Sequence, residues 1–355
     1  MAKKLQVSDN PTTTWLDIPG GQSNLDSSAG EIDDTILGQS YHSGEVGLIT
    51  WSLTGDAFYK GFPGYQAKIQ KQGTSTVLTA ATTTQVGATK TYQIDDTTKR
   101  RLDRSVAVVI KDAGATVATA DIESIDYLFG RVTFVSGYTP TLPVTFDSGA
   151  YFPLATLAKA NSYTLTMTAD TKEDTDFATV QANGGYQAFS PGLRTVGLSL
   201  GGTFAPSVSN FRTELAARNE FLIEIDAAGD GLSIARGFFK LTTGGQSGAV
   251  GALEEETLDF TLNVPFLENP ALDKPFGWEH DATTTLPSGI QKVLTGWETQ
   301  TKLTAQYLPS GAAGQSPLDG VRGVVVVTGA TLTGDMGSMN TFSVTLQGDG
   351  AYTVV

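Results

Sequence analysis

Side chains that could carry out catalysis or bind a metal are few in this chain. It has two histidines, His42 and His280, and neither has other residues at a catalytic or metal-binding spacing. A surface or interface role is therefore favoured for both histidines over a catalytic one. Cysteine is absent, which excludes disulfides, thiol catalysis and cysteine-ligated zinc.

Two acidic clusters are the remaining candidates for chemistry. Residues 170–176 (Asp-Thr-Lys-Glu-Asp-Thr-Asp) offer the oxygen atoms that calcium prefers, but they include Lys172 and lack the glycine and final glutamate of an EF-hand loop. A solvated acidic loop explains them better. Residues 254–256 (Glu-Glu-Glu) could do acid–base work, yet adjacent charges before a strand are typical of an edge that blocks unwanted pairing. We therefore expect no enzymatic activity, no metal site and no cofactor.

The charge of the chain argues against tight binding of nucleic acid. The net charge is −14, whereas binding to phosphates needs clustered Lys and Arg. The one basic cluster, at 99–104, adjoins Asp95, Asp96 and Asp103, which favours a solvated turn. No apolar run approaches the ~20 residues of a membrane span. The first residues, Met-Ala-Lys-Lys-Leu, lead us to expect no signal peptide.

The elements that must position these residues are mainly β-strands, because apolar and polar residues alternate. Phe221, Ile223 and Ile225 alternate with Glu224 and Asp226. The runs 257–262 and 341–346 alternate in the same way. This pattern predicts antiparallel strands with one buried and one solvated face.

Two short helices are expected among the strands. Ser207 or Ser209 can cap the first, which would reach Ala217. Ser288 can cap the second, whose apolar residues have helical spacing: Ile290, Val293, Leu294 and Trp297.

Similar sequences recur in the chain and indicate two copies of one domain. Residues 235–238 (Ala-Arg-Gly-Phe) match 321–324 (Val-Arg-Gly-Val) at an offset of 86, and 257–262 match 341–346 at an offset of 84. Upstream, 51–55 match 198–202 at an offset of 147. The changed offset predicts a nested arrangement. The first copy would comprise 1–75 and 271–355, interrupted by a small β-domain at 76–158 and by the continuous second copy at 159–270.

Together these features resemble the tail tube (major tail) proteins of long-tailed bacteriophages. The residues that carry the resemblance are 340–350, and 31–35 followed by 44–54. The resemblance implies an all-β fold with short helices: two tail-tube-type β-sandwich or barrel domains in one chain plus a small all-β, Ig-like insert. We expect the insert to be peripheral and dispensable for assembly.

The resemblance also implies a function and partners. Six such domains form a ring, and rings stack into a tube for DNA, so two copies per chain imply a homotrimer ring with pseudo-sixfold symmetry. The implied partners are other copies of the chain, the tape-measure protein, tail-end proteins, and double-stranded DNA passing without specific binding, with no membrane. The implied location is the virion tail, and the host cytoplasm before assembly.

Two groups of residues follow as candidates. Those expected to face solvent, some of them lining the lumen, are Glu224, Asp226, Asp259, Thr341, Ser343 and Thr345. Two long segments, 20–44 and 169–191, are expected to be mobile loops that bridge to the next ring through Ile32, Asp33, Asp34, Ile36, Leu37, Asp174, Asp176, Phe177 and Phe189.

Other functions stay open from the sequence. The alternatives are another β-rich virion component, such as a head decoration or baseplate protein, a cell-surface or carbohydrate-binding β-protein, and a glycan-active enzyme that uses paired acids. The expected lack of a signal peptide weighs against the cell-surface protein. The lack of a convergent acid–base cluster weighs against the enzyme.

Overall fold

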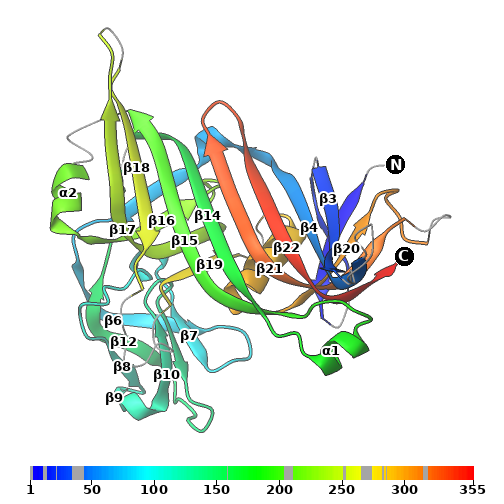
Figure 1. Cartoon of the computed structure of the whole chain (residues 1–355). Helices are drawn as coiled ribbons and strands as arrows, with labels where there is room; N and C mark the ends of the chain where they lie inside the picture. The colour runs from blue at the N-terminus through cyan, green and yellow to red at the C-terminus, as the bar shows by residue number, and fades with distance from the viewer. Residues whose placement is uncertain are drawn as a thin grey trace. The chain divides into compact units, whose positions relative to one another are not determined.

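The protein is all-β with three short α-helices among the residues described, which confirms the expected fold class (Figure 1). The computed structural model describes residues 3–10, 14–20, 22–33, 44–157, 159–203, 211–250, 253–264, 274–281, 284, 286–314 and 319–355. Contacts divide the chain into two units. Unit 1 comprises Met1–Gln66, Ser162–Leu198 and Ala282–Val355, and unit 2 comprises Ala67–Asn161 and Ser199–Asp281.

Unit 1 is an antiparallel sheet with a helix packed on it. Outside Ser162–Leu198, its strands are β1 (Lys4–Asp9), β2 (Leu16–Ile18), β3 (Gln22–Asp33), β4 (Gly44–Pro63), β20 (Leu303–Leu308), β21 (Val321–Asp335) and β22 (Met339–Val354), and a 3₁₀ turn η1 (Gly64–Gln66) follows β4. Hydrogen bonds order them as β3–β4–β22–β21–β20–β1–β2. The side chains of Leu53, Leu332 and Leu346 are fully buried in this sheet.

Helix α3 (Ser288–Thr299) confirms the second predicted helix, but the predicted cap is wrong, because the N-cap residue is Pro287 and no side chain caps the helix. Ile290, Val293 and Leu294 are each 0% exposed, because their spacing places them on one face. The helix ends where Gln300 adopts a left-handed conformation with φ 56°.

Unit 2 contains two sheets. The first holds β5 (Lys68–Gln72), β13 (Leu154–Thr156), β16 (Glu220–Asp226), β17 (Ser233–Ser247), β18 (Glu255–Leu262) and β19 (Phe276–His280). The second, within the predicted insert, holds β6 (Thr76–Gln85), β7 (Thr91–Ile94), β8 (Val109–Asp112), β9 (Ala115–Thr116), β10 (Ile122–Asp126), β11 (Arg131–Phe134) and β12 (Val144–Tyr151), with 3₁₀ turns η2 (Thr97–Lys99) and η3 (Thr119–Asp121). Helix α2 (Phe211–Ala217) lies where the first helix was predicted, and Ser207 and Ser209 lie outside the described residues.

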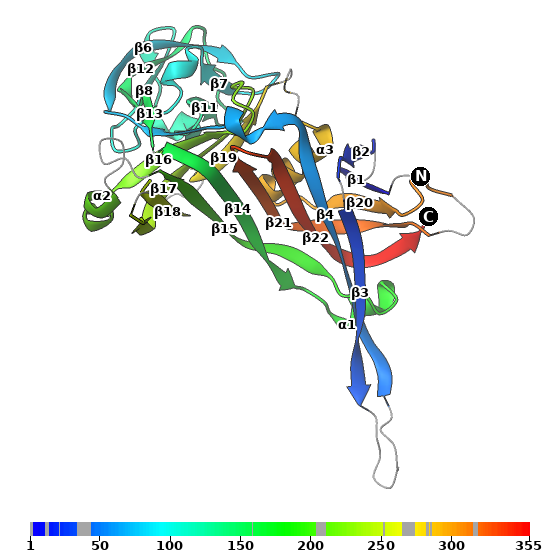
Figure 2. The ribbon, with the colours of Figure 1, turned by 90° about the horizontal axis from the view of Figure 1, so that it is seen from above.

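The two segments expected to be mobile loops are largely regular structure, so that expectation is wrong for their described parts. β3 occupies most of the described part of the first segment and pairs with β4 from Gln22↔Asp56 to Asp33↔Gly44, forming one long hairpin (Figure 2). In the second segment, β14 (Lys159–Glu173) leads to helix α1 (Phe177–Ala182) and then β15 (Phe189–Thr203). The polar composition hid these strands, since backbone pairing with a neighbour does not require apolar side chains.

The two hairpins β17–β18 and β21–β22 share one register. Leu241 pairs with Phe260 and Val327 with Leu346, an offset of 86 on both strands, and a bulge follows at the same place in each. The offset of 84 inferred for the second strand is therefore two residues short. Sequence alternation does not detect such a shift, because moving a strand by two residues keeps every side chain on its face.

Candidate assembly edges and the faces beside them

His280 is a structural residue of unit 2. Its ring stacks on Trp278, with centroids 5.8 Å apart, and its Nδ1 lies 2.9 Å from the Ser233 hydroxyl. Burial lowers the pKa of His280 to about 4, so the ring is neutral at pH 7. His42 lies outside the described residues.

The low pKa of His280 predicts a loss of stability in acid. The unfolded chain binds the proton near pH 6.5 and the folded chain only near pH 4, so the contribution is present above pH 6.5 and is lost as the pH falls towards 4. Between pH 7 and 5 the free energy of unfolding should fall by about 2 kcal/mol more in the wild type than in His280→Phe. Urea titrations at both pH values measure this difference. An equal change in the free energy of unfolding between pH 7 and 5 in the two proteins would contradict the prediction.

The acidic run that suggested calcium serves the local fold. The Asp176 carboxylate caps α1 by accepting the Thr179 amide at 2.6 Å, a bond that lowers its pKa. Glu173 accepts from Gln187, and Asp174 from Ser190. No cluster of three potential metal ligands occurs among the described residues. No helix in the same part of the chain is long and apolar enough to span a membrane.

The repeated Arg-Gly pairs form equivalent contacts in the two sheets. In unit 1, Arg322 on β21 donates to Gln306 on β20 at 2.8 and 3.0 Å. In unit 2, Arg236 on β17 donates to Glu224 on β16 at 2.7 Å. An aromatic ring lies beside each guanidinium: Trp15 beside Arg322 at 4.9 Å, and Phe129 beside Arg236 at 4.9 Å.

The predicted insert supplies the second charge that Glu224 needs. Arg101 Nη1 lies 3.3 Å from the Glu224 carboxylate and is itself buried, with its Nε donating to the Phe152 carbonyl. The reading of this basic cluster as a solvated turn is therefore wrong for Arg101. Only strand pairing shows the equivalence: Arg322 lies opposite the amide Gln306 in unit 1, whereas Arg236 lies opposite the carboxylate Glu224 in unit 2.

The expectation of a solvated face is therefore wrong for two of the lumen candidates. Glu224 is 7% exposed and Asp226 is 4% exposed. Asp226 accepts the Gly229 and Gly231 amides at 2.8 and 2.9 Å, and burial raises its pKa. Alternation separated the two faces of β16 correctly, but it does not tell whether the polar face is also covered.

The other four lumen candidates lie on the faces opposite the core, as the alternation predicted. Thr341, Ser343 and Thr345 alternate with buried Phe342, Val344 and Leu346. Asp259 is half-buried between buried Leu258 and Phe260, and accepts from the Ser199 hydroxyl at 2.6 Å.

In unit 1 these residues belong to a hydroxyl-rich face that crosses adjacent strands. Cross-strand pairing places Thr164 of β14 beside Thr333 of β21, and Thr333 beside Thr341 of β22. The face continues through β22 and β4 to β3, where Thr345 pairs with Thr54 and Thr54 with Asn24. We call this surface the hydroxyl face; its members are Asn24, Asp26, Ser28, Ser52, Thr54, Asp56, Thr164, Thr166, Thr168, Thr331, Thr333, Thr341, Ser343 and Thr345.

One strand junction is used within the chain. β21 pairs through Val321–Val325 with β20, and beyond this, on the same edge, it pairs with β14 from Gly329↔Thr168 to Asp335↔Ser162. β14 is thus paired along an edge of β21, and its inward side chains Tyr163, Leu165 and Met167 are buried.

β17 and β3 have edges equivalent to those that β21 and β14 use, but among the described residues these edges of β17 and β3 are not paired. β17 pairs with β16 only up to Lys240, so the part from Thr243 to Ser247 is paired on one side only, with β18. β3 pairs with β4 alone, and Gln22, Asn24, Asp26 and Ser28 are exposed along it. In the part of the chain that the structure describes, two strand edges are therefore unpaired and available for contact with another chain.

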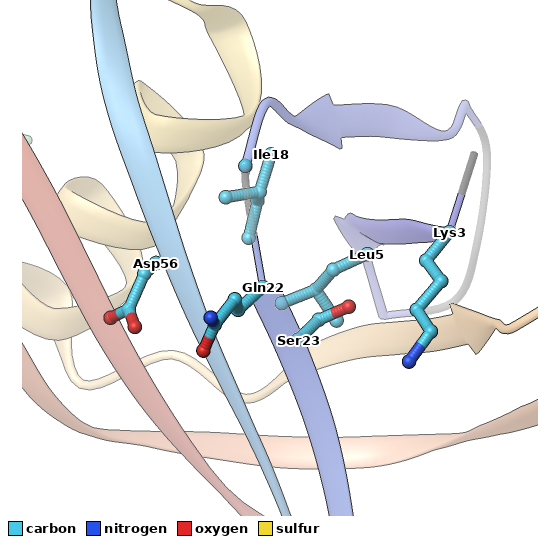
Figure 3. Close-up of a pocket in the computed structure, with 8 residues that line it drawn as sticks. Lys3, Leu5, Ile18, Gln22, Ser23 and Asp56 are labelled. Atoms are coloured by element: carbon cyan, nitrogen blue, oxygen red, sulfur yellow. The ribbon is translucent and has the colours of Figure 1, made fainter.

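A surface pocket of about 220 Å³ opens beside the start of β3 (Figure 3). Its buried apolar side chains are Leu5 and Ile18, from β1 and β2. The remaining labelled residues around it are Lys3, Gln22, Ser23 and Asp56.

The candidates for ring-to-ring contact are spread over two hairpins of unit 1. Ile32 is exposed on β3, and Phe177, at the start of α1, is 98% exposed. Phe189 is half-buried, and its amide donates to Asp349 at 2.8 Å. Asp33 lies at the end of β3, while Asp34, Ile36 and Leu37 lie outside the described residues.

Comparison with known proteins gives weak matches only. No protein-family model and no curated protein matches the chain. Among solved structures it is similar to the tail of an empty gene transfer agent particle with C6 symmetry, at 18% identity and a TM-score of 0.27, over 31% of this chain and 81% of that one. It is also similar to a chain in the virion of a native gene transfer agent, at 18% identity and a TM-score of 0.27, over 30% and 82%. These values are too low to assign a family or a function.

Proposed function

We propose that this protein is a non-enzymatic structural protein of a virion tail. In this proposal three copies close into a pseudo-sixfold ring, and rings stack into the tube that conducts DNA. One observation carries the proposal: the β14–β21 junction is made within the chain, whereas the equivalent edges of β3 and β17 are left unpaired among the described residues.

The equivalence of the strands rests on matching cross-strand contacts. The hydroxyls of Ser28 and Thr50 lie 3.0 Å apart across β3 and β4, and those of Thr168 and Thr195 lie 2.6 Å apart across β14 and β15. β3 therefore corresponds to β14 at an offset of 140. With the offset of 86 between β17 and β21, the pairing of Thr168 with Gly329 becomes one of Ser28 with Thr243 of a second copy.

A ring follows from the polarity of this contact. β3 of one chain would pair with β17 of the next, so each chain has one edge of each kind and the contact is head-to-tail. Such contacts close into a ring when the rotation between subunits divides the circle. Each chain would contribute one internal junction, β14 with β21, and one external junction, β3 with β17 of the next chain. A ring of three chains would therefore contain six equivalent junctions.

The hydroxyl face suits a channel for DNA. In the proposal it lines the lumen with Asp259 and its neighbours in unit 2. Threonine and serine side chains keep a passing duplex hydrated, while the net charge of −14 repels phosphate. The domain boundaries at 75, 158 and 270, and the contact of Phe177 and Ile32 with the next ring, are part of the same proposal.

Cysteine cross-linking tests the ring and its register together. The chain has no cysteine, so the variant Ser28→Cys/Thr243→Cys introduces a single designed pair. Directly opposed residues of an antiparallel pair have Cβ atoms about 4.5–5.5 Å apart, close enough for a disulfide after a small shift. Oxidation should give covalent oligomers of up to three chains on denaturing gels.

The matched control shifts the register by four residues. In Ser28→Cys/Ser247→Cys both residues are exposed, but the predicted separation is about 13 Å along the strand, which is too far for a disulfide. Equal cross-linking of both variants would contradict the register. A wild-type protein that stays monomeric at high concentration would contradict the ring.

A further inference from the structure

The pocket beside β3 is built around small residues. A Cβ atom on Gly55 would lie 2.6 Å from Leu5 Cδ2, and one on Gly20 would overlap the Asp56 carbonyl oxygen. Glycine at these two positions lets the backbone approach its neighbours closely. Leu5 and Ile18 then form an apolar floor, with Lys3 and Asp56 at the rim (Figure 3).

The corresponding place on β14 is occupied by an aromatic ring. Ser23 corresponds to Tyr163 at the offset of 140, and Tyr163 is 3% exposed. Its ring lies directly against Gly334 of β21, where a Cβ atom would overlap Tyr163 Cε1. The internal junction is thus filled by its own tyrosine, whereas serine at the same place in β3 leaves room for a side chain from elsewhere.

The β17–β18 hairpin carries apolar side chains that the described residues leave uncovered. Val250 is fully exposed and Leu253 is 76% exposed. The predicted register places Gly248 of a second copy opposite Ser23, and Ala249 opposite Gln22, so Val250 would follow at the pocket. Glu254 and Glu255, which are exposed next to the tip, complement the charge of Lys3.

We infer that this pocket receives the β17–β18 tip of a second copy of the chain, with Val250 and Leu253 against Leu5 and Ile18. The inference rests on the proposed ring contact and adds a second attachment point to it. Hydrogen bonds between strand edges are insensitive to sequence, so the apolar side chain in its pocket would fix the register.

The test compares two cysteine pairs and an acidic variant. Lys3→Cys/Val250→Cys should cross-link between chains on oxidation, and Lys3→Cys/Val77→Cys should not, because Val77 is also exposed but lies on β6. Val250→Asp/Leu253→Asp should raise the concentration needed for assembly at least tenfold without changing the urea midpoint of the monomer. Val77→Asp should change neither the concentration needed for assembly nor the urea midpoint.

The outcomes separate this inference from the ring itself. If Ser28→Cys/Thr243→Cys cross-links and Lys3→Cys/Val250→Cys does not, the pocket has another role and the ring stands. If neither pair cross-links, both proposals fall. Unchanged assembly by Val250→Asp/Leu253→Asp would overturn the pocket inference whatever the cross-linking gives.

Discussion

Glu224→Ala is expected to lower the free energy of unfolding of unit 2 by about 3–5 kcal/mol, because it leaves two buried guanidinium groups without their shared carboxylate. Arg236 is 3% exposed and Arg101 is 6% exposed, so water does not replace the lost partner. Urea unfolding should show the loss. Hydrogen exchange of peptides from β16 and β17 should locate it in unit 2 and leave β21 and β22 unchanged.

A double-mutant cycle makes this prediction specific to the charges. Glu224→Gln alone should also destabilise, since it leaves a positive charge unbalanced. Adding Arg101→Met should recover most of the loss, because the pair then resembles Arg322 with Gln306 in unit 1. If Arg101→Met added its own full cost to that of Glu224→Gln, the two residues would not be coupled.

The same cluster revises the expectation that 76–158 can be removed without cost. Arg101 contacts Glu224, and Arg100 and Arg131 contact Glu279, at 3.4 and 2.8 Å. Deleting the insert removes these three arginines. The carboxylates of Glu224 and Glu279 then lose these partners on a sheet surface that the deletion exposes. We expect the deletion to be tolerated better when Glu224→Gln accompanies it.

Thr345→Lys is expected to leave the tube intact and to slow the exit of DNA, most strongly at low salt. Thr345 is exposed on the hydroxyl face, so the longer side chain has room. In the proposed ring the change adds three cations to every layer. Each phosphate contact steepens the dependence of DNA affinity on salt by about one logarithmic unit, so the effect multiplies along the tube.

The measurement is DNA release from virions at several salt concentrations. Val77→Lys adds the same charge to an exposed site on β6 of the insert and should leave release unchanged. Asp259→Lys should behave like Thr345→Lys if both line the lumen. Normal release by intact virions with Thr345→Lys would remove the hydroxyl face from the lumen.

Local sequence patterns predicted the helices and strands correctly more often than they predicted what packs against them. The spacing of Ile290, Val293, Leu294 and Trp297 located a helix, because one buried stripe needs no other information. The alternation from Thr341 to Leu346 gave the correct faces for the same reason. Glu224 was misplaced because alternation within one strand carries no information about its partners, Arg236 on the next strand and Arg101, which is 123 residues away in the sequence.

Edges were harder to predict than faces. The segment from Gln22 to Asp33 has few apolar residues, so nothing in it marks a strand except the backbone that β4 pairs with. The unpaired edge of β3 suggested a contact with another chain only by comparison with β14, whose equivalent edge pairs with β21 within the chain. That comparison needs the register of both hairpins, and sequence similarity gave the offset between β18 and β22 with an error of two residues.

The place of β22 has a consequence for synthesis. This strand lies between β21 and β4, yet its residues, Met339–Val354, leave the ribosome after all other strands of unit 1. Until then β4 and β3 form a hairpin detached from β21, and a nascent chain has no complete sheet to offer a neighbour. If the chains assemble as proposed, polymerisation of half-made chains on one messenger RNA would thereby be avoided, since each copy would become competent to join others only once its translation has passed β22.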